Sequence, residues 1–346
     1  MSHRKPWISE RLYPPCEISA LVRLLRDEGV SATAVLNRTG LDGATLDSPA
    51  CRTSIEQALQ VCRNAMRLAP DPALALRAGA RSRLSDRGMV GLLLGACESG
   101  RDYAAHALRY QCLATPWFRL HAEETVDTAV WIAHEDASEL PDDLRVFLVA
   151  LHAMQQLTHL RDALGTDCRP IQARFAHRAP AHAQAYERLL GCPCVFEGER
   201  HEIRFAKDTL ARHSRQANPI ATALLRPGCD TELAELAGHQ GYGGCVARTL
   251  TRLRDPGASM KTVASLLKLS DRTLRRRLAE EGTSFSAVAG EVQRRIATQQ
   301  LKCAETRIED VAANSGYSDA ANFRRAFIRW TSMSPAQFRR AQQRAR

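Results

Sequence analysis

Apolar residues recur at helical spacing through the first hundred residues of the chain. In residues 18–29 they form one stripe that ends at Gly29, and glycine is favoured where a helix closes in a left-handed conformation. The same spacing predicts further helices over residues 30–41, from Ser54 onward, over 70–79 with its end at Gly79, and over 102–114. Residues 87–96 are Gly-rich and apolar, which suggests close helix packing. The first part of the chain is therefore expected to be mainly helical.

Alternating and β-branched residues mark a change near residue 117. Phe118–Glu124 and Thr128–His134 flank the turn signal Val126-Asp127, which predicts a hairpin. A long helix with one apolar side is expected over Pro141–Leu164. Then follow a strand over 171–177, a helix over 181–190, and a second hairpin made by 194–197 and 202–205 around Gly198. This order of elements predicts an α+β domain with helices on one face of a sheet.

The stretch Ile308–Pro335 has the pattern of two short helices joined by a sharp turn. Gly316 ends the first helix, and we expect Ser318 to cap the second, with Asp319 in its first turn. The apolar side chains of the second helix recur at i, i+4 and i+7 and form one stripe: Phe323, Phe327 and Trp330. A short helix, a Gly turn and a helix with Arg and Asn on its free face is typical of a helix-turn-helix unit.

An internal repeat supports this interpretation. Residues 262–278, TVASLLKLSDRTLRRRL, repeat the same pattern of apolar and capping residues about 48 positions upstream. The offset between matching residues is 48 in the first helix and 49 in the second. Lys268 stands where the second copy has Gly316, and a single non-Gly residue can adopt the left-handed conformation at a cost of about 1–2 kcal/mol. We predict two helix-turn-helix units, residues 261–282 and 308–331, joined by a linker helix over 285–302.

Two segments carry a resemblance to a known family. LSDRTLRRRLAEEGTSF (269–285) is similar to the first recognition helix and its exit in the AraC/XylS family of bacterial transcription regulators. GYSDAANFRRAFIRWTSMSPAQFR (316–339) is similar to the second unit and signature of that family. Residues from about 246 to 340 thus resemble its DNA-binding domain, which implies an all-α fold with two helix-turn-helix units.

The N-terminal region resembles the effector domain of an AraC/XylS subgroup that includes the ornithine-utilisation regulators. The resemblance spans roughly residues 17–212 and is carried by PDPALALRAG, AAHALRYQCLA, IQARFAHRAP and VFEGERHEIRFAKDTL. It implies a domain that senses a small molecule.

Charge is distributed unevenly along the 346 residues, whose net charge is +10. Residues 243–346 hold 20 Lys and Arg against 9 Asp and Glu, whereas the preceding residues hold 28 against 29. A basic domain beside a neutral one fits phosphate contact by one end only. Because His239–Gly244 looks the most flexible stretch, we place the domain boundary beside it. Residues 1–235 are then the regulatory domain, with its sheet from about 117, and residues 236–346 the DNA-binding domain.

The family's pattern implies which side chains face DNA. In the first recognition helix these are Arg272, Arg275 and Arg276, and Arg is the commonest reader of guanine in the major groove. We expect Arg277 beside them to touch phosphate. The second helix offers Asn322 and Arg325 for base reading, Ala320 and Ala321 for packing on a thymine methyl group, and Arg324 for a base or a phosphate.

A pocket for the effector is expected between the sheet and the long helix. Its candidate contacts are aromatic or polar-tipped side chains of those elements: Trp117, Trp131, Arg174, His177 and Tyr186. For each of them, a core or surface role is the favoured interpretation over contact with a ligand. His152 and His159 lie seven positions apart on one helix face, and we expect them to pack or to be partly exposed.

The 11 cysteines are odd in number and scattered, so reduced, buried thiols are expected. Cys192-Pro-Cys194, with His201 nearby, leaves open an alternative function, a redox- or metal-responsive DNA-binding sensor. A zinc site normally needs four ligands, so no metal or other cofactor is expected. The sequence also lacks G-x-S-x-G, a Gly-rich phosphate loop and H-E-x-x-H, and an enzyme is not expected.

These patterns predict a cytosolic, bacterial-type transcription regulator. The N-terminus has no apolar core of a signal peptide, and no apolar run approaches the roughly 20 residues of a membrane span. The expected partners are double-stranded DNA at an operator or promoter, a small-molecule effector, RNA polymerase if the protein activates, and a second copy through the N-terminal domain. A chromatin-type DNA binder is disfavoured because such proteins rarely carry a large neutral domain.

Overall fold

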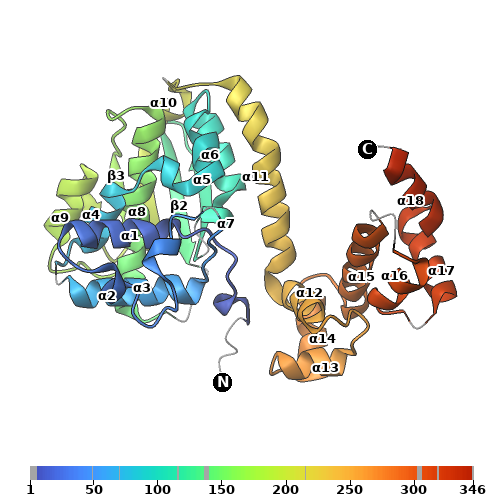
Figure 1. Cartoon of the computed structure of the whole chain (residues 1–346). Coiled ribbons are helices and arrows are strands. Elements are labelled where there is room, and N and C mark those ends of the chain that lie inside the picture. The colour runs from blue at the N-terminus through green and yellow to red at the C-terminus, as the bar shows by residue number, and fades with distance from the viewer. Residues whose placement is uncertain are drawn as a thin grey trace. The chain divides into compact units, whose positions relative to one another are not determined.

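The structure, a computed structural model, describes residues 6–48, 50–69, 71–114, 117–135, 140–214, 216–301, 306–317 and 319–344. The chain divides into two compact units, one covering Ile8–Ala234 and the other formed mainly by Glu235–Arg346. Within the described ranges only the first unit contains a β-sheet (Figure 1). In the same ranges, no helix combines the length and the apolar character that crossing a membrane requires.

A series of short helices precedes the sheet. They are η1 Pro6–Ser9, α1 Cys16–Asp27, α2 Ala32–Val35, η2 Gly43–Thr45, α3 Ile55–Leu68, α4 Leu74–Arg81, η3 Leu84–Arg87, α5 Gly88–Gly95, α6 Gly100–Arg109 and α7 Gln111–Ala114. Helix α3 begins with a capping box between Ser54 and Gln57. The helix predicted over 30–41 is wrong beyond α2, because Arg38 and Gly40 turn the chain with φ of 61° and 65°.

The sheet has five strands in the order β1-β2-β5-β3-β4. The elements of this part are β1 Phe118–Glu124, β2 Thr128–Glu135, α8 Asp142–Leu164, β3 Gln172–Arg174, α9 Ala183–Leu190, β4 Cys194–Val195, β5 His201–Ala206 and α10 Asp208–Ala211. β1 and β2 pair antiparallel as the predicted first hairpin. The α+β class predicted for this domain is confirmed.

The predicted second hairpin is wrong, because β4 and β5 do not pair with each other. Strand β3 lies between them, parallel to β4 and antiparallel to β5. The chain between them crosses the end of β3 instead of folding back: Glu197 N–H donates to His177 O and Gly198 N–H donates to Phe175 O, both at 2.9 Å. Glu197, with φ of 58°, makes this bend.

Helix α8 lies against one face of the sheet and is buried along most of its length. It also packs closely on α4, and Gly79 makes this possible. A Cβ atom at Gly79 would lie 2.6 Å from Cβ of Met154 and 2.8 Å from the carbonyl oxygen of Leu151. Gly79 therefore does not end α4, as its sequence context predicted, but lets two helices approach.

A long helix, α11 Pro219–His239, follows the sheet and contains the boundary between the two units. It is fixed in the first unit by Asp230, whose Oδ1 accepts from Arg109 Nη2 and from Tyr110 Oη, both at 2.8 Å. The stretch 239–244, expected to be flexible, contains the end of α11 and the start of the next helix. α11 continues past Pro227 to His239. The next helix, α12 Gly241–Leu253, begins two residues after the end of α11, and Gly241 has a φ of 75° at the turn.

The second unit is helical throughout its described residues. After α12 come α13 Met260–Leu266, α14 Asp271–Glu280, α15 Phe285–Leu301, α16 Ile308–Asn314, α17 Ala320–Thr331 and α18 Pro335–Arg344. It has two apolar cores, each centred on one helix pair. Helix α15 contributes Val292 to the first core and Ala297 and Leu301 to the second. The linker helix is thus shared by both cores.

Candidate nucleic-acid interface and effector cavity

The first helix-turn-helix unit is α13, its turn and α14. Lys268 holds the left-handed turn with φ of 57°, and Leu269 N–H donates to Ala264 O at 2.9 Å. Ser270 Oγ caps α14 by accepting from Thr273 N–H at 3.1 Å. Leu274 and Leu278 are fully buried, and this leaves the opposite face of α14 to solvent.

The second unit is α16, its turn and α17. Gly316 has φ of 83°, and a Cβ there would lie 2.6 Å from the backbone nitrogen of Gly257, so the turn needs glycine on two counts. The residue that caps α17 is Asp319, whose Oδ1 accepts from Asn322 N–H at 2.7 Å. The prediction of Ser318 as the cap is wrong in this respect; Ser318 itself lies outside the described residues.

The sequences of the two helix-turn-helix units align with one inserted residue in the second unit. The turns match at an offset of 48, since Tyr317 N–H donates to Ala312 O as Leu269 does to Ala264 O. The caps Ser270 and Asp319 match at 49, which places the extra residue at position 318. Arg275 and Arg276 then correspond to Arg324 and Arg325, whereas Arg272 corresponds to Ala321.

The predicted DNA-facing side chains of α14 divide into two groups. Arg272, Arg275 and Arg276 are exposed. Arg277 is half-buried: its guanidinium lies 5.7 Å from the ring centroid of Tyr242 and donates to Glu280 at 3.0 Å. The hydrogen bond that Arg277 donates to Glu280, and then the charge interaction with Tyr242, raise the pKa of Arg277 further. Its phosphate contact stays a prediction.

On α17 the exposed face carries Ala321, Asn322, Arg324 and Arg325. Arg325 Nη2 donates to Asn322 Oδ1 at 2.5 Å, so the two candidate base readers form a pair. Both line an open groove that also includes Tyr317 and Arg329. Arg329 was not among the predicted contacts, although its place four residues after Arg325 puts it on the same helix face.

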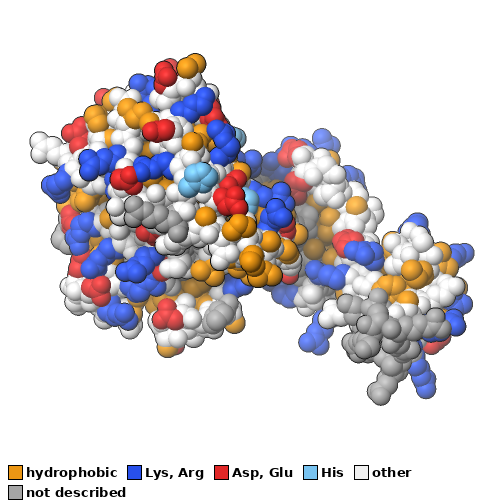
Figure 2. Space-filling model, turned by 90° about the horizontal axis from the view of Figure 1, so that it is seen from above, with side chains coloured by type: hydrophobic (Ala, Val, Ile, Leu, Met, Phe, Trp, Pro, Cys, Tyr) orange, Lys and Arg blue, Asp and Glu red, His pale blue; other side chains and the backbone are white. Residues whose placement is uncertain are grey.

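The distribution of charge differs between the two compact units. In the view of Figure 2, Asp and Glu side chains are interspersed with Lys and Arg over the larger unit. The excess of Lys and Arg over Asp and Glu in the sequence belongs to residues 243–346, which form most of the second compact unit.

A narrow apolar cavity lies between the sheet and α8, in the position predicted for the effector pocket. Trp131, alone among the five predicted contacts, lines it. Trp117 lines a separate small cavity with Tyr13 and Ile55. Arg174 Nε donates to Gln172 Oε1 at 2.9 Å on the sheet surface.

His177 and Tyr186 belong to an aromatic cluster that adjoins the cavity through Phe175 and His201. Tyr186 is fully buried, and its hydroxyl has no hydrogen-bond partner among the described residues. Whether any of these side chains touches an effector stays a prediction.

Cys192 and Cys194 lie beside β4. Cys192 is buried and Cys194 half-buried, with Cys194 Sγ 3.5 Å from Cys192 O. The hydrogen bond with Cys192 and then burial raise the pKa of the Cys194 thiol, which keeps it protonated. Among the described residues, no three His, Cys, Asp or Glu side chains gather in a way that could hold a metal ion.

Comparisons with known proteins agree with this architecture. Residues 29–214 match the family described as the arabinose-binding domain of AraC transcription regulators, and residues 248–341 match a helix-turn-helix domain family. The chain is 28% identical to the ornithine utilization regulator of Pseudomonas aeruginosa, over 95% of this chain and 97% of that one. It is 28% identical to the transcriptional regulator VqsM of the same species, over 76% and 82%.

A solved structure is similar as well. The crystal structure of the transcriptional regulator CdpR from Pseudomonas aeruginosa matches with a TM-score of 0.50 and 25% identity, covering 94% of this chain and 98% of that one. The helix-turn-helix match and the relatives named as transcription regulators identify a DNA-binding transcription regulator. The chain belongs to the AraC family of transcription regulators, as the match to the arabinose-binding domain family, over more than half of its length, establishes.

Proposed function

We propose that this regulator reads a specific DNA site with both recognition helices, α14 and α17, in two successive major grooves. The observation that carries this proposal is the shared linker helix: α15 packs into both cores, so the two recognition helices are attached to one rigid element. Tyr317 strengthens the link, because its hydroxyl donates to Gln293 Oε1 of α15 at 3.1 Å.

Base reading is assigned to the exposed side chains on each helix. Arg272, Arg275 and Arg276 serve one groove, and Asn322 and Arg325 serve the next. Arg forms a bidentate pair with guanine and Asn with adenine, each worth about 1–3 kcal/mol of discrimination. Arg324 and Arg329 flank this set and are assigned to phosphate or base contact, while Ala321 leaves room for a thymine methyl group.

Regulation is assigned to the α+β domain, with the effector bound in the cavity between the sheet and α8. If the regulator works as a dimer, a second copy of the chain is a further partner. If it works as an activator, RNA polymerase is one. The alternative of a metal-responsive sensor through Cys192 and Cys194 is disfavoured, because no three His, Cys, Asp or Glu side chains of the described residues are grouped so that they could hold a metal ion.

Selection of binding sites from random duplex DNA tests this function. The full-length protein is expected to enrich an asymmetric site with two half-sites whose centres lie about 10 bp apart. Arg276→Ala should relax base preference in one half and Arg325→Ala in the other, each variant serving as the other's control. Enrichment of a single half-site by the wild type would contradict the proposal.

A further inference from the structure

His152 is a buried histidine whose ring nitrogens have no hydrogen-bond partner in the described part of the chain. It lies on α8 with 4% of its surface exposed, and neither ring nitrogen has a partner among the described residues. Its ring lies against Phe118, with 4.8 Å between the ring centroids. A buried polar group without a partner costs about 1–3 kcal/mol. Such a group in a cavity wall is available to form a hydrogen bond with a molecule that enters the cavity.

The second histidine on the same helix face provides the contrast. His159 is also buried, but both of its ring nitrogens are used. Arg87 Nε donates to Nδ1 at 3.1 Å, which leaves the proton on Nε2, 2.9 Å from Ser82 Oγ. The core of this domain therefore satisfies one histidine of the pair completely and leaves the other open.

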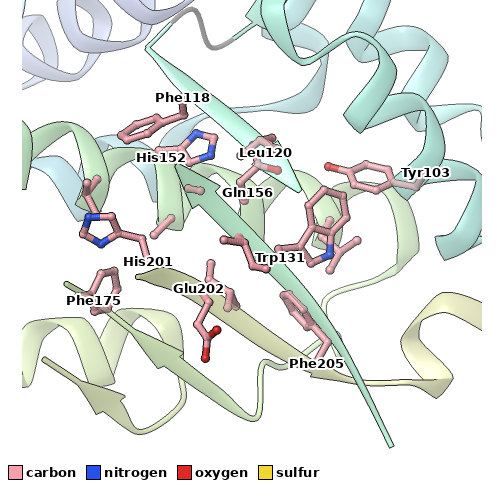
Figure 3. Close-up of a pocket in the computed structure, with 16 residues that line it drawn as sticks. Tyr103, Phe118, Leu120, Trp131, His152, Gln156, Phe175, His201, Glu202 and Phe205 are labelled. Atoms are coloured by element: carbon pink, nitrogen blue, oxygen red, sulfur yellow. The ribbon is translucent and has the colours of Figure 1, made fainter. Parts of the chain in front are cut away.

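The cavity that His152 faces is mainly apolar. Its 16 lining residues come from α6, α8 and strands β1, β2 and β5, with Phe175 just after β3 (Figure 3). Figure 3 shows His152, Leu120 and Trp131 around the same space, with Gln156 one turn along α8 from His152. Gln156 is half-buried and adds a second group that can donate or accept a hydrogen bond.

No charged side chain of the described lining is available to a ligand. Glu202 is the one acidic residue there, and it faces the other side of the sheet, as strand alternation requires. Its carboxylate accepts from Arg200 Nε at 2.8 Å and Arg204 Nε at 2.8 Å. Burial lowers the pKa of His152 to about 3 and that of His201 to about 4, so both rings are neutral near pH 7.

We propose that this cavity binds a neutral, mainly apolar molecule with one hydroxyl, carbonyl or amide group that hydrogen-bonds to His152. The inference rests on the proposed function, since it names the class of effector for the same site. A charged diamino acid does not fit, because its ammonium and carboxylate groups would lose hydration without gaining a counter-charge.

The walls have to move when the molecule enters. The space in which a water-sized sphere can move is about 30 Å³, enough for one or two water molecules. Trp131, 9% exposed, lies in the wall and is positioned to report its movement.

Calorimetric titration of the full-length protein with three probes tests the proposal. 4-Methylphenol has an apolar ring with one hydroxyl, toluene lacks the hydroxyl, and ornithine is a charged diamino acid. We expect 4-methylphenol to bind about three- to tenfold more tightly than toluene, the range that one neutral hydrogen bond supplies, and ornithine not to bind. Equal affinities for the two aromatic probes, binding of ornithine alone, or no binding of any probe would overturn the proposal.

Two variants locate the binding. His152→Phe replaces the imidazole by a somewhat larger aromatic ring without nitrogens, and it should bind the two aromatic probes equally. Ala153→Leu fills the cavity from the next position on α8, and it should abolish binding of both. Retained preference for 4-methylphenol in His152→Phe would overturn the assignment of His152. If Ala153→Leu does not fold, the comparison with His152→Phe still decides.

DNA affinity, measured on the same samples, separates this inference from the proposed function. Binding of 4-methylphenol through His152 without any change in DNA affinity supports the cavity's chemistry and contradicts effector control through it. A protein that binds none of the probes and yet reads its DNA site leaves the regulator intact and removes the inference.

Discussion

Glu281 accepts a hydrogen bond from the backbone N–H of Tyr242 at 2.8 Å, and its second carboxylate oxygen accepts from Gly243 N–H at 3.0 Å. The residue that ends the first recognition helix thereby caps the first turn of α12. A carboxylate at a helix N-terminus satisfies free N–H groups and opposes the positive end of the helix dipole. The orientation of α14 is therefore coupled to α12.

Glu281→Ala should lower the free energy of unfolding of the DNA-binding unit by about 1–2 kcal/mol, because two backbone donors lose their acceptor. Urea unfolding of the fragment 236–346 measures this. Glu280→Ala is the matched control, since Glu280 is exposed and forms surface ion pairs with Arg276 and Arg277, so its loss should cost about 0.5 kcal/mol or less. Equal costs for the two substitutions would argue against the cap.

Phe327→Ala should lower the free energy of unfolding by about 3–5 kcal/mol and unfold the second helix-turn-helix unit, because the ring is fully buried between Phe323 and Phe338. Thermal unfolding followed by circular dichroism tests it. Ile328→Ala, at the next position and 45% exposed, should change stability by no more than about 0.5 kcal/mol. Unchanged stability of Phe327→Ala would mean that the buried face of α17 is wrongly assigned.

The affinity for DNA should fall steeply with salt, with a log–log slope of about −0.9 for each neutralised phosphate. The motivation is the excess of 20 Lys and Arg over 9 Asp and Glu in residues 243–346. Fluorescence anisotropy with a labelled duplex at several salt concentrations gives the slope. An affinity that does not respond to salt would contradict phosphate contact by this unit.

Stability should fall on acidification, and His152 should contribute to the loss. Its pKa is lowered by burial to about 3 from an ordinary value near 6.5, so the folded state binds fewer protons than the unfolded state between these values. The free energy of unfolding therefore drops by about 1.4 kcal/mol for each pH unit between 6.5 and 3 on account of this residue. In His152→Phe this part of the pH dependence should be absent. If the difference in free energy of unfolding between the wild type and His152→Phe is constant from pH 7 to pH 5, the assigned contribution of His152 is contradicted.

The helix-turn-helix units were predictable because local signals determine them. Gly316 and Lys268 occupy the left-handed positions that the repeat predicts, and the buried stripe of α17 contains Phe323 and Phe327. The capping residue was misplaced by one position, since Ser318 and Asp319 are both good caps and only the geometry of the turn distinguishes them.

The sheet was harder because its pairing depends on contacts between distant residues. β3 covers only Gln172–Arg174, too short to show an alternating pattern, yet it separates β4 from β5. The cavity posed the same difficulty. His152 and His159 look equivalent in sequence, and the difference between them comes from Ser82 and Arg87, more than sixty positions away along the chain.

The central claim is that one chain reads two successive major grooves, and a change in the spacing of the two half-sites tests it most directly. α15 has 17 residues, about 25 Å at 1.5 Å per residue, and helix widths of about 10 Å bring the recognition helices to the spacing of about 34 Å between grooves. Inserting five base pairs between the half-sites turns the second to the opposite face of the duplex. We predict that the affinity of the full-length protein then falls to that of a single half-site, whereas an unchanged affinity would mean that only one unit reads DNA.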